Sequence, residues 1–271
     1  MRLRLYSTAF WLFLAASSIV LFPVALGIWV ITAPFDRRRV LLHRFTCFWA
    51  SLYTWLNPAW PVRIEGRERI RPDGIYVMVA NHQSLLDILV LFRLFTHFKW
   101  VSKIENFRVP LIGWNMSLNR YIRLKRGDRE SVVRMLGECR RTLAAGSSIL
   151  MFPEGTRSSD GSLRAFKAGA FELALETQRP ILPIVVEGTS RALPKRGFVL
   201  QGRHAIRVTV LDEIAYASFA SEPVASLSDR VRALIAQQLG AEPLFSPGSG
   251  GALRGPGCDR SRGGRRAGSG A

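Results

Sequence analysis

A long stretch without a single charged side chain sets the first constraint on how this chain folds. Residues 9–33 are almost entirely apolar or small. As a helix, at about 1.5 Å per residue, they exceed the roughly 30 Å hydrocarbon core of a bilayer. A cleavable signal peptide has a shorter apolar stretch, so we predict an uncleaved membrane anchor. Pro23 leaves two forms of this anchor open, a kinked span or a helical hairpin.

Basic residues on both sides of this stretch predict its orientation. Two arginines precede it and four follow between residues 37 and 44. The positive-inside rule then places the following domain on the cytoplasmic side of the inner membrane. Residues 40–56 are rich in aromatic side chains but include His43 and Arg44, which predicts an interfacial helix, with an ordinary core helix as the alternative. Residues 1–60 are therefore expected to form an anchor and an interfacial helix.

Charge and composition narrow the classes of partner. The chain has 271 residues and a formal net charge of +18, which indicates an anionic membrane surface, an anionic substrate or nucleic acid. Its three cysteines and four histidines are scattered, so we expect no metal site and no disulfide framework. From Ser246 onward Gly, Ser, Pro and Arg dominate, which predicts a disordered basic tail over residues 244–271.

Between these ends, short β-branched runs alternate with helical stretches. This alternation is typical of β-α-β units and begins after Pro61. It predicts one α/β domain over residues 61–243, of a size that can bury a full hydrophobic core. The expected strands are 74–80, 148–152, 181–187 and 205–211, and the expected helices are 84–95, 129–145, 168–177 and 227–239.

A histidine and an aspartate mark the turn after the first of these strands. His82 follows the strand at its carboxyl end, where open α/β sheets bind ligands. From there, Asp87 can accept a hydrogen bond from one ring nitrogen, which leaves the other as the acceptor that a general base needs. Ser84 and Asp87 also match a capping box, which explains the aspartate without catalysis. Spacing alone supports the two interpretations equally.

A second strand-end turn carries groups suited to an anion. Glu154, Gly155, Thr156 and Arg157 follow the expected strand 148–152. The glycine permits close backbone approach, the threonine offers a hydroxyl, and the arginine offers a planar fork that matches phosphate. Alone, such a turn is more often a solvated loop. Because both turns follow predicted strands, however, we expect them to open on the same edge of one sheet.

Taken together, these motifs resemble the glycerolipid acyltransferase family, in particular the bacterial 1-acylglycerol-3-phosphate (lysophosphatidic acid) acyltransferases. The similarity covers roughly residues 62–212, and several motifs in order are far more specific than any one of them. The resemblance implies a mixed sheet flanked by helices. The stretches that carry it are 81–87, 100–103 with 109–113, 121–126, 152–158 and 181–188.

The resemblance also implies a reaction, for which no cofactor is expected. His82, oriented by Asp87, would deprotonate the free sn-2 hydroxyl of a 1-acylglycerol-3-phosphate as it attacks the thioester of acyl-CoA or acyl carrier protein. The product would be phosphatidic acid. Anionic membrane lipid is the other expected partner, and nucleic acid is not expected.

Basic residues would hold the acceptor phosphate in this interpretation. The resemblance gives that role to Lys103, Arg126 and Arg157, so that the hydroxyl lies within reach of the imidazole. Lys125 stands where the family often has an acidic residue, which predicts a more basic pocket. Glu154 is expected to order its loop rather than to transfer protons, because a neighbouring arginine favours the charged carboxylate.

Two alternatives remain open at this point. The acceptor could be another lysolipid, such as a lyso-ornithine lipid. The chain could also be a basic membrane adaptor that binds nucleic acid or anionic lipid without catalysis, for which the charge is the only support. An enzyme predicts a sharp loss on changing His82, whereas an adaptor predicts steep salt dependence and indifference to that residue.

Overall fold

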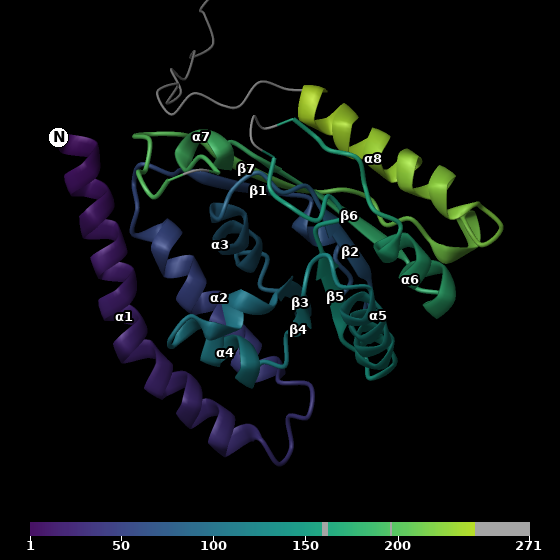
Figure 1. Ribbon diagram of the computed structural model, residues 1–271, viewed down its shortest axis with the longest axis horizontal. Coiled ribbons are helices and arrows are strands. Elements are labelled where there is room, and N and C mark those ends of the chain that lie inside the picture. The colour runs from purple at the N-terminus through teal and green to yellow at the C-terminus, as the bar shows by residue number, and fades with distance from the viewer. Residues whose placement is uncertain (159–161, 196, 242–271) are drawn as a thin grey trace, which may run out of the picture.

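The structure, a computed structural model, describes residues 1–158, 162–195 and 197–241. The predicted tail over residues 244–271, and the last two residues of the predicted domain, lie outside these ranges. Within them, two helices precede a domain in which helices and strands alternate along one seven-stranded sheet (Figure 1).

All seven strands belong to one mixed sheet, in the order β1-β7-β6-β2-β5-β3-β4. β6 and β7 are antiparallel, and every other neighbouring pair is parallel. The predicted mixed sheet flanked by helices is therefore confirmed. Since β2 to β6 run in the same direction, their carboxyl ends lie along one edge, here named the carboxyl edge. The strands are β1 (Val62–Glu65), β2 (Val77–Ala80), β3 (Phe98–Lys103), β4 (Ile122–Leu124), β5 (Ser148–Met151), β6 (Ile181–Glu187) and β7 (Ile206–Val210).

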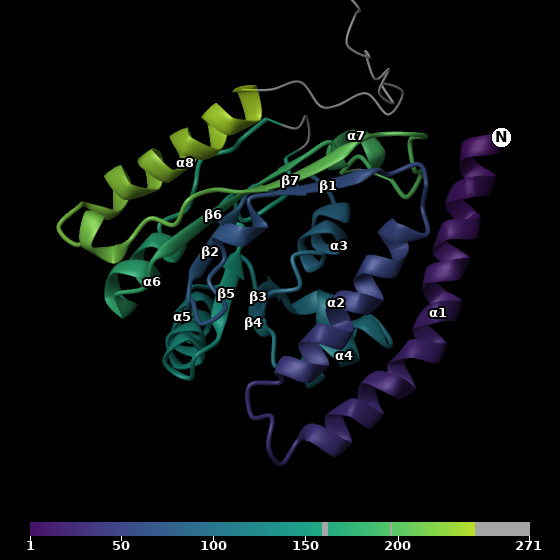
Figure 2. The same cartoon turned by 180° about the vertical axis from the view of Figure 1, so that it is seen from behind.

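Helices cover both faces of this sheet (Figures 1 and 2). In β2, Met78 and Ala80 join the buried cluster that includes α2 and α3, whereas Val77 and Val79 join the cluster that includes α5 and α6. Central strands buried on both faces are continuously apolar, which is why they can be recognised in the sequence. The helices of the domain are α3 (Leu86–Phe92), α4 (Ile112–Leu118), α5 (Arg129–Ala144), α6 (Gly169–Thr177), α7 (Thr189–Ala192) and α8 (Val224–Ala241).

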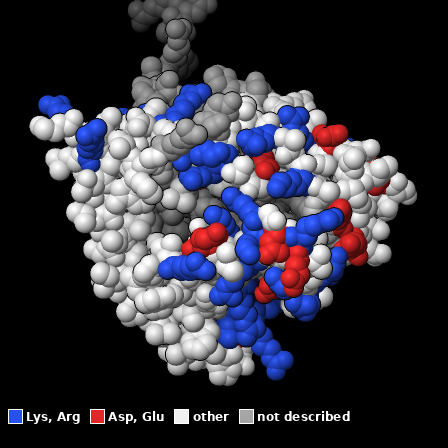
Figure 3. All heavy atoms as spheres, viewed as in Figure 1, with Lys and Arg blue, Asp and Glu red and all other residues white. Residues whose placement is uncertain are grey.

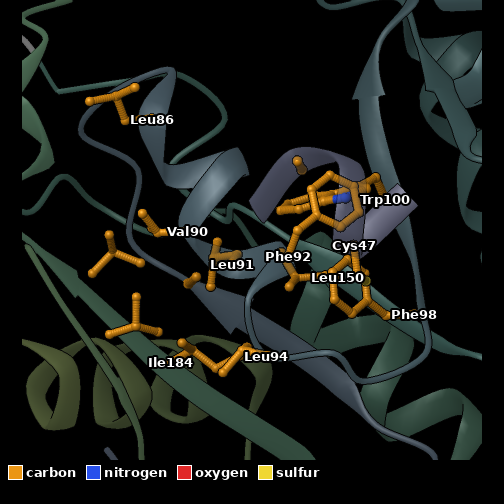
Figure 4. Close-up of a cluster of buried hydrophobic side chains, with 14 of the residues drawn as sticks. Cys47, Leu86, Val90, Leu91, Phe92, Leu94, Phe98, Trp100, Leu150 and Ile184 are labelled. Carbon is orange, nitrogen blue, oxygen red and sulfur yellow. The ribbon is translucent and has the colours of Figure 1, made fainter. Parts of the chain in front are cut away.

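The buried side of α3 packs on the centre of the sheet. Figure 4 shows Val90 and Leu91 of this helix in one cluster with Leu150 of β5 and Ile184 of β6, and all four side chains are fully buried. Close-packed contacts of this kind leave a helix little freedom to shift. The first turn of α3, which carries Asp87, is therefore held in place by the core beneath it.

The four predicted strands and four predicted helices are confirmed, with small shifts at their ends. Five further elements were not predicted from the sequence, namely β1, β3, β4, α4 and α7. β1 is an edge strand of four residues with charged side chains at Arg63 and Glu65, and β4 at the other edge has only three residues. β3 contains Lys99 and Lys103, which interrupt its apolar run. Short or charged strands give little periodicity to recognise.

The N-terminal apolar stretch forms one continuous helix, α1 (Arg2–Thr32), that runs through Pro23. The helical-hairpin alternative is therefore wrong. Among the described residues, α1 is the one helix long and apolar enough to cross a membrane, and only 11% of its most apolar window is buried. A core helix of a soluble protein would be mostly buried, so the exposed apolar side of α1 indicates membrane association.

One side of α1 packs along the domain instead of leaving it (Figures 1 and 2). Near its start, the Ser7 hydroxyl accepts a hydrogen bond from the Leu200 backbone N–H at 2.9 Å, and Trp11 Nε1 donates to the Phe198 carbonyl at 2.7 Å. These contacts join the helix to the segment between α7 and β7. The anchor and the domain therefore form one packed unit at this end.

The segment that follows α1 is hydrogen-bonded to the domain near the start of β3, at the edge of the sheet opposite the carboxyl edge. The Lys99 ammonium is buried and donates to the backbone carbonyls of Arg38 at 2.7 Å and Asn119 at 2.8 Å. Arg38 in turn donates to the Gly146 carbonyl at 2.8 Å. Burial lowers the pKa of Lys99 to about 7. This cluster holds the far end of α1 against the domain.

The helix α2 (Val40–Trp55) has a buried side and an apolar exposed side. His43 is fully buried between the Tyr121 hydroxyl and the Thr96 carbonyl, and burial holds its pKa well below the usual value. The core-helix alternative therefore describes the inner side of α2. Its outer side exposes Phe48 and Trp55, for which the interfacial placement stays a prediction.

Candidate active site

His82 and Asp87 meet in the turn between β2 and α3. His82 follows Ala80 and Asn81 at the carboxyl edge, and its Nδ1 lies 2.8 Å from Asp87 Oδ2. A carboxylate only accepts hydrogen bonds, so Nδ1 carries a proton, and in the neutral form of the ring Nε2 is the nitrogen that can accept one. Asp87 is fully buried, whereas 9% of His82 is exposed. The contact expected from the spacing is confirmed, with a ring nitrogen left to accept a proton.

The Asp87 carboxylate also organises the turn itself. Its Oδ2 accepts the backbone N–H groups of Gln83 at 2.7 Å and Ser84 at 2.8 Å, and its Oδ1 accepts the hydroxyl proton of Thr189. Half of the predicted capping box is present, since the carboxylate reaches back to the Ser84 amide. The structural and catalytic interpretations of Asp87 are thus compatible, because the same carboxylate bonds both the turn and the imidazole.

The other half of the capping box is wrong. The Ser84 hydroxyl does not accept from the Asp87 amide but from the Leu86 amide, at 3.2 Å. It donates its proton to the Leu193 carbonyl at 2.6 Å. The two contacts use the hydroxyl to join the turn to the segment that follows α7. Its proton therefore points to a backbone carbonyl and not to His82.

Glu154, from the turn after β5, holds the backbone of His82. Its Oε1 accepts the His82 N–H at 2.7 Å and its Oε2 accepts the Arg164 N–H at 3.2 Å. The Ser158 N–H donates to the His82 carbonyl at 2.9 Å. The two strand-end turns therefore meet at the carboxyl edge as predicted, and Glu154 joins them.

The arginine side chain that was expected to favour the charged form of Glu154 is not among its hydrogen-bond partners. Burial raises the pKa of this carboxyl, and the backbone N–H groups of His82 and Arg164 act in the opposite direction. The side chain is only 4% exposed and its hydrogen bonds are to backbone amides instead of an arginine side chain. An ordering role fits these contacts, because a carboxylate that accepts two N–H groups is fixed in place.

One face of the His82 ring is covered by an aromatic column. The ring of Phe152 stacks on it with centroids 3.9 Å apart and planes 10° apart. Phe152 in turn stacks on Trp100, with centroids 5.6 Å apart. Stacking confines the imidazole to one plane, so its free edge is presented in one direction. This role of Phe152 was not predicted from the sequence, although its place directly after β5 was a usable signal.

Asn81 joins the His82 turn to β6. Its side-chain amide donates to the Val186 carbonyl and accepts from the Val186 N–H, both at 2.8 Å. The pair continues the ladder between β2 and β6, which ends in register at Ala80 and Ile184. The residue before the catalytic candidate is therefore fixed as firmly as a strand residue. It too was missed as a separate contributor.

The predicted phosphate-binding residues also lie at the carboxyl edge, where Figure 3 shows Lys and Arg side chains gathered with acidic ones among them. Arg126 follows β4, and partial burial lowers its pKa, while Glu105 raises it and Arg157 lowers it. Arg126 and Arg157 are thus close enough to repel each other. An anion between them would relieve that repulsion.

Two lysines of this region are paired with carboxylates. Lys103, at the end of β3, forms an ion pair with Glu105 at 3.2 Å. Lys125 pairs with Asp128 at 3.2 Å, so its charge is shared with that carboxylate, and the expected gain in positive charge is smaller. A lysine that was not predicted, Lys167, lies over the second turn.

Gly155 allows that close approach of Lys167. The glycine has φ +69°, and a Cβ there would lie 2.9 Å from Lys167 Cε. The positive φ favours a glycine here, whereas the flexible end of the Lys167 side chain could move away from a Cβ. Thr156 follows it, partly exposed, and its hydroxyl stays a predicted contributor to anion binding. The sequence predicts that Gly155 permits close approach to its backbone. In the structure, the group that approaches it is the Lys167 side chain.

Thiol and metal chemistry find little support among the described residues. No group of three or more His, Cys, Asp or Glu side chains is placed there to hold a metal ion. Cys47 and Cys139 are buried, and burial raises the pKa of each thiol to about 12. Neither thiol is therefore a reactive thiolate at neutral pH.

The sequence pattern of the acyltransferase family matches residues 61–187 of this chain. A 1-acyl-sn-glycerol-3-phosphate acyltransferase of Limnanthes alba is 32% identical over 195 residues, which are 70% of this chain and 68% of that protein. One of Chlamydomonas reinhardtii is 41% identical over 186 residues, which are 68% of this chain and 55% of that protein. A chloroplast counterpart from Arabidopsis thaliana is 40% identical over 178 residues, 65% of this chain and 49% of its own length.

The chain thus spans about half the length of the last two relatives. Among solved structures, it is similar to the 1-acyl-sn-glycerophosphate (LPA) acyltransferase PlsC from Thermotoga maritima, with a TM-score of 0.71 and 23% sequence identity. The match covers 88% of this chain and 96% of that structure. At this level of identity the likeness concerns the fold.

Proposed function

Because this chain belongs to the acyltransferase family, we propose that it transfers an acyl chain to the free sn-2 hydroxyl of 1-acyl-sn-glycerol-3-phosphate, giving phosphatidic acid. The donor is a thioester, either acyl-CoA or acyl carrier protein. The observation that carries the proposal is the 2.8 Å contact between His82 Nδ1 and the buried Asp87 carboxylate. It leaves the second ring nitrogen as a base at the carboxyl edge, where Arg126 follows β4 and Arg157 follows β5.

The proposed reaction needs one base and no covalent enzyme intermediate. His82 Nε2 accepts the proton of the sn-2 hydroxyl while the oxygen attacks the thioester carbonyl carbon. Asp87 stabilises the imidazolium that forms, because it accepts from Nδ1–H throughout. The carbon–sulfur bond then breaks, and the leaving thiolate takes the proton back from Nε2. Atoms and charge balance, and the ring returns to its starting state.

Positioning of the acceptor completes the proposal. Arg126 and Arg157 hold the phosphate from the ends of β4 and β5, with Lys103 nearby at the end of β3. A phosphate held between two guanidinium groups is fixed in direction, which brings the hydroxyl two carbons away toward the imidazole. Glu154, Gly155 and Thr156 shape the turn that carries Arg157.

We also propose that the exposed side of α1 and the outer side of α2 enter the inner membrane from its cytoplasmic face. The ridge formed by α1 is almost entirely free of charge (Figure 3), and Arg37 to Arg39 follow it. Because α1 packs along the domain, entry of the helix brings the carboxyl edge close to the bilayer. Both substrates carry acyl chains, so this placement shortens their path to the site.

A panel of acceptors tests the proposed function. The full chain, purified in neutral detergent, is given labelled acyl-CoA or acyl carrier protein with 1-acylglycerol-3-phosphate, lysophosphatidylcholine, lyso-ornithine lipid or glycerol-3-phosphate. We expect 1-acylglycerol-3-phosphate to give the highest kcat/KM. A faster reaction with another acceptor would reassign the substrate, and salt-dependent lipid binding with no transfer to any acceptor would favour the adaptor alternative.

Direct attack by the acceptor hydroxyl is tested at Ser84, the residue with a hydroxyl group that lies nearest to His82 in the sequence. Its contacts with Leu86 and Leu193 are structural, so we expect Ser84→Ala to cost about 1 to 3 kcal/mol of stability and only part of the activity. Incubation with labelled acyl thioester alone, followed by denaturation, should leave no bound label. Stoichiometric label that disappears in Ser84→Ala would instead identify an acyl-serine intermediate.

A further inference from the structure

The Asp87 carboxylate is supported from a third segment of the chain. Its Oδ2 accepts three N–H groups, from the His82 ring and from the Gln83 and Ser84 backbone. Its Oδ1 accepts the hydroxyl proton of Thr189, which lies 102 residues further along the chain. Both side chains are fully buried. Water is therefore not a ready replacement for this hydroxyl.

The position of Thr189 is set by the turn after β6. Gly188 has φ +84°, and a Cβ at this position would lie 2.1 Å from the Ala205 carbonyl oxygen. Only glycine fits there, so the chain leaves β6 in one fixed direction. Asn81 bonds the preceding residues of β6 to the His82 turn through Val186. The threonine thus approaches Asp87 from a rigid strand end.

A donor on each oxygen fixes the plane of a carboxylate. With donors on Oδ2 alone, the Asp87 carboxylate would keep one anionic oxygen buried without a partner. It would then rotate or shift to share its donors, and the oxygen that faces His82 Nδ1 would move with it. The orientation of the ring depends on that oxygen. The hydroxyl of Thr189 therefore acts on the imidazole through Asp87.

We propose that Thr189 is a positioning residue of the His82–Asp87 pair, which fixes the carboxylate plane and so keeps the proton of the neutral imidazole on Nδ1. This inference rests on the proposed function for its kinetic part. Its structural part, the tautomer of His82, stands independently of any substrate. Nothing in the reaction requires Thr189 to touch the substrate.

Two variants at Thr189 and one matched control test this role. Thr189→Val keeps the shape and removes the hydroxyl, whereas Thr189→Ser keeps the hydroxyl. Thr209→Val is the control, since Thr209 is buried in β7 and its hydroxyl has no hydrogen-bond partner among the described residues. We expect Thr189→Val to lower kcat by roughly 10- to 100-fold with KM changed less than about threefold. Thr189→Ser and Thr209→Val should retain most of the turnover.

The second measurement reads the tautomer directly in the full chain without substrate. Histidine labelled with ¹⁵N reports which ring nitrogen is protonated, and the His82 signals are assigned by their loss in His82→Gln. We expect the Nδ1–H form in the native chain and in Thr189→Ser, and a mixture of tautomers in Thr189→Val. Unfolding curves show whether each variant is folded when it is measured.

These outcomes separate the inference from the proposed function. If Thr189→Val is folded and keeps both native turnover and the Nδ1–H tautomer, the inference is wrong. It is also wrong if Thr189→Ser fails as severely as Thr189→Val, because then the hydroxyl is not the group that matters. If the native chain transfers no acyl group but the tautomer changes in Thr189→Val, the proposed function falls and the positioning role stands.

Discussion

Replacing His82 by glutamine is expected to lower acyl transfer by about 10²- to 10⁴-fold, the usual effect of losing a general base. Glutamine keeps a polar side chain of similar length but has no group that accepts a proton at neutral pH. His82 lies in a turn whose backbone is bonded to Glu154 and Ser158, so these contacts remain. Initial rates with saturating 1-acylglycerol-3-phosphate and acyl-CoA measure the loss.

The matched control is His97→Gln. His97 comes directly before β3, away from the carboxyl edge, and burial lowers the pKa of its ring to about 3, so it is neutral at the assay pH. Its replacement removes an imidazole without removing a charge, and native turnover is expected. Near-native turnover in folded His82→Gln would contradict the general-base role and leave the turn with a structural role only.

Replacing Asp87 by asparagine is expected to lower kcat by roughly 10²- to 10⁴-fold with a smaller change in KM. The amide oxygen can still accept from the His82 ring and from the Gln83 and Ser84 amides, while its NH₂ group can donate to the Thr189 oxygen. Geometry is therefore kept and the negative charge is lost. The imidazolium formed during transfer loses its stabilising partner.

Asp87→Ala separates the charge of this residue from its packing. Alanine leaves the backbone N–H groups of Gln83 and Ser84 and the Thr189 hydroxyl without an acceptor, which costs about 1 to 3 kcal/mol for each group left unpaired. We expect Asp87→Asn to remain folded in denaturant titrations and Asp87→Ala to be strongly destabilised. Full activity of folded Asp87→Asn would show that the carboxylate charge is not needed.

The central strands were predictable because burial on both faces makes them apolar throughout. β6 (Ile181–Glu187) was predicted with its correct ends, since all seven of its residues are buried. β3 was missed because Lys99, its second residue, is charged, yet the Lys99 ammonium donates to two backbone carbonyls inside the protein. Patterns of hydrophobicity cannot anticipate that a lysine will find such partners in distant segments.

The site was predictable where its residues are close in sequence. The contact of His82 with Asp87 follows from a strand end, a turn and the start of a helix. The contacts of Thr189 and Phe152 arise because β6 and β5 flank β2, and that strand order is a property of the whole sheet. The hydrogen-bond partners of Glu154 were not predicted for the same reason, because they are backbone N–H groups of other segments.

The packing of α1 has a kinetic consequence for the proposed reaction at a membrane. The helix is fastened near its start by Ser7 and Trp11 and beyond its end through Arg38, so it does not act as a loose tether. A domain on a flexible leash would sample acceptors dissolved in the aqueous phase. A domain locked to its helix diffuses in the plane of the bilayer instead, and the quantity that sets its rate is the mole fraction of acceptor among the surrounding lipids.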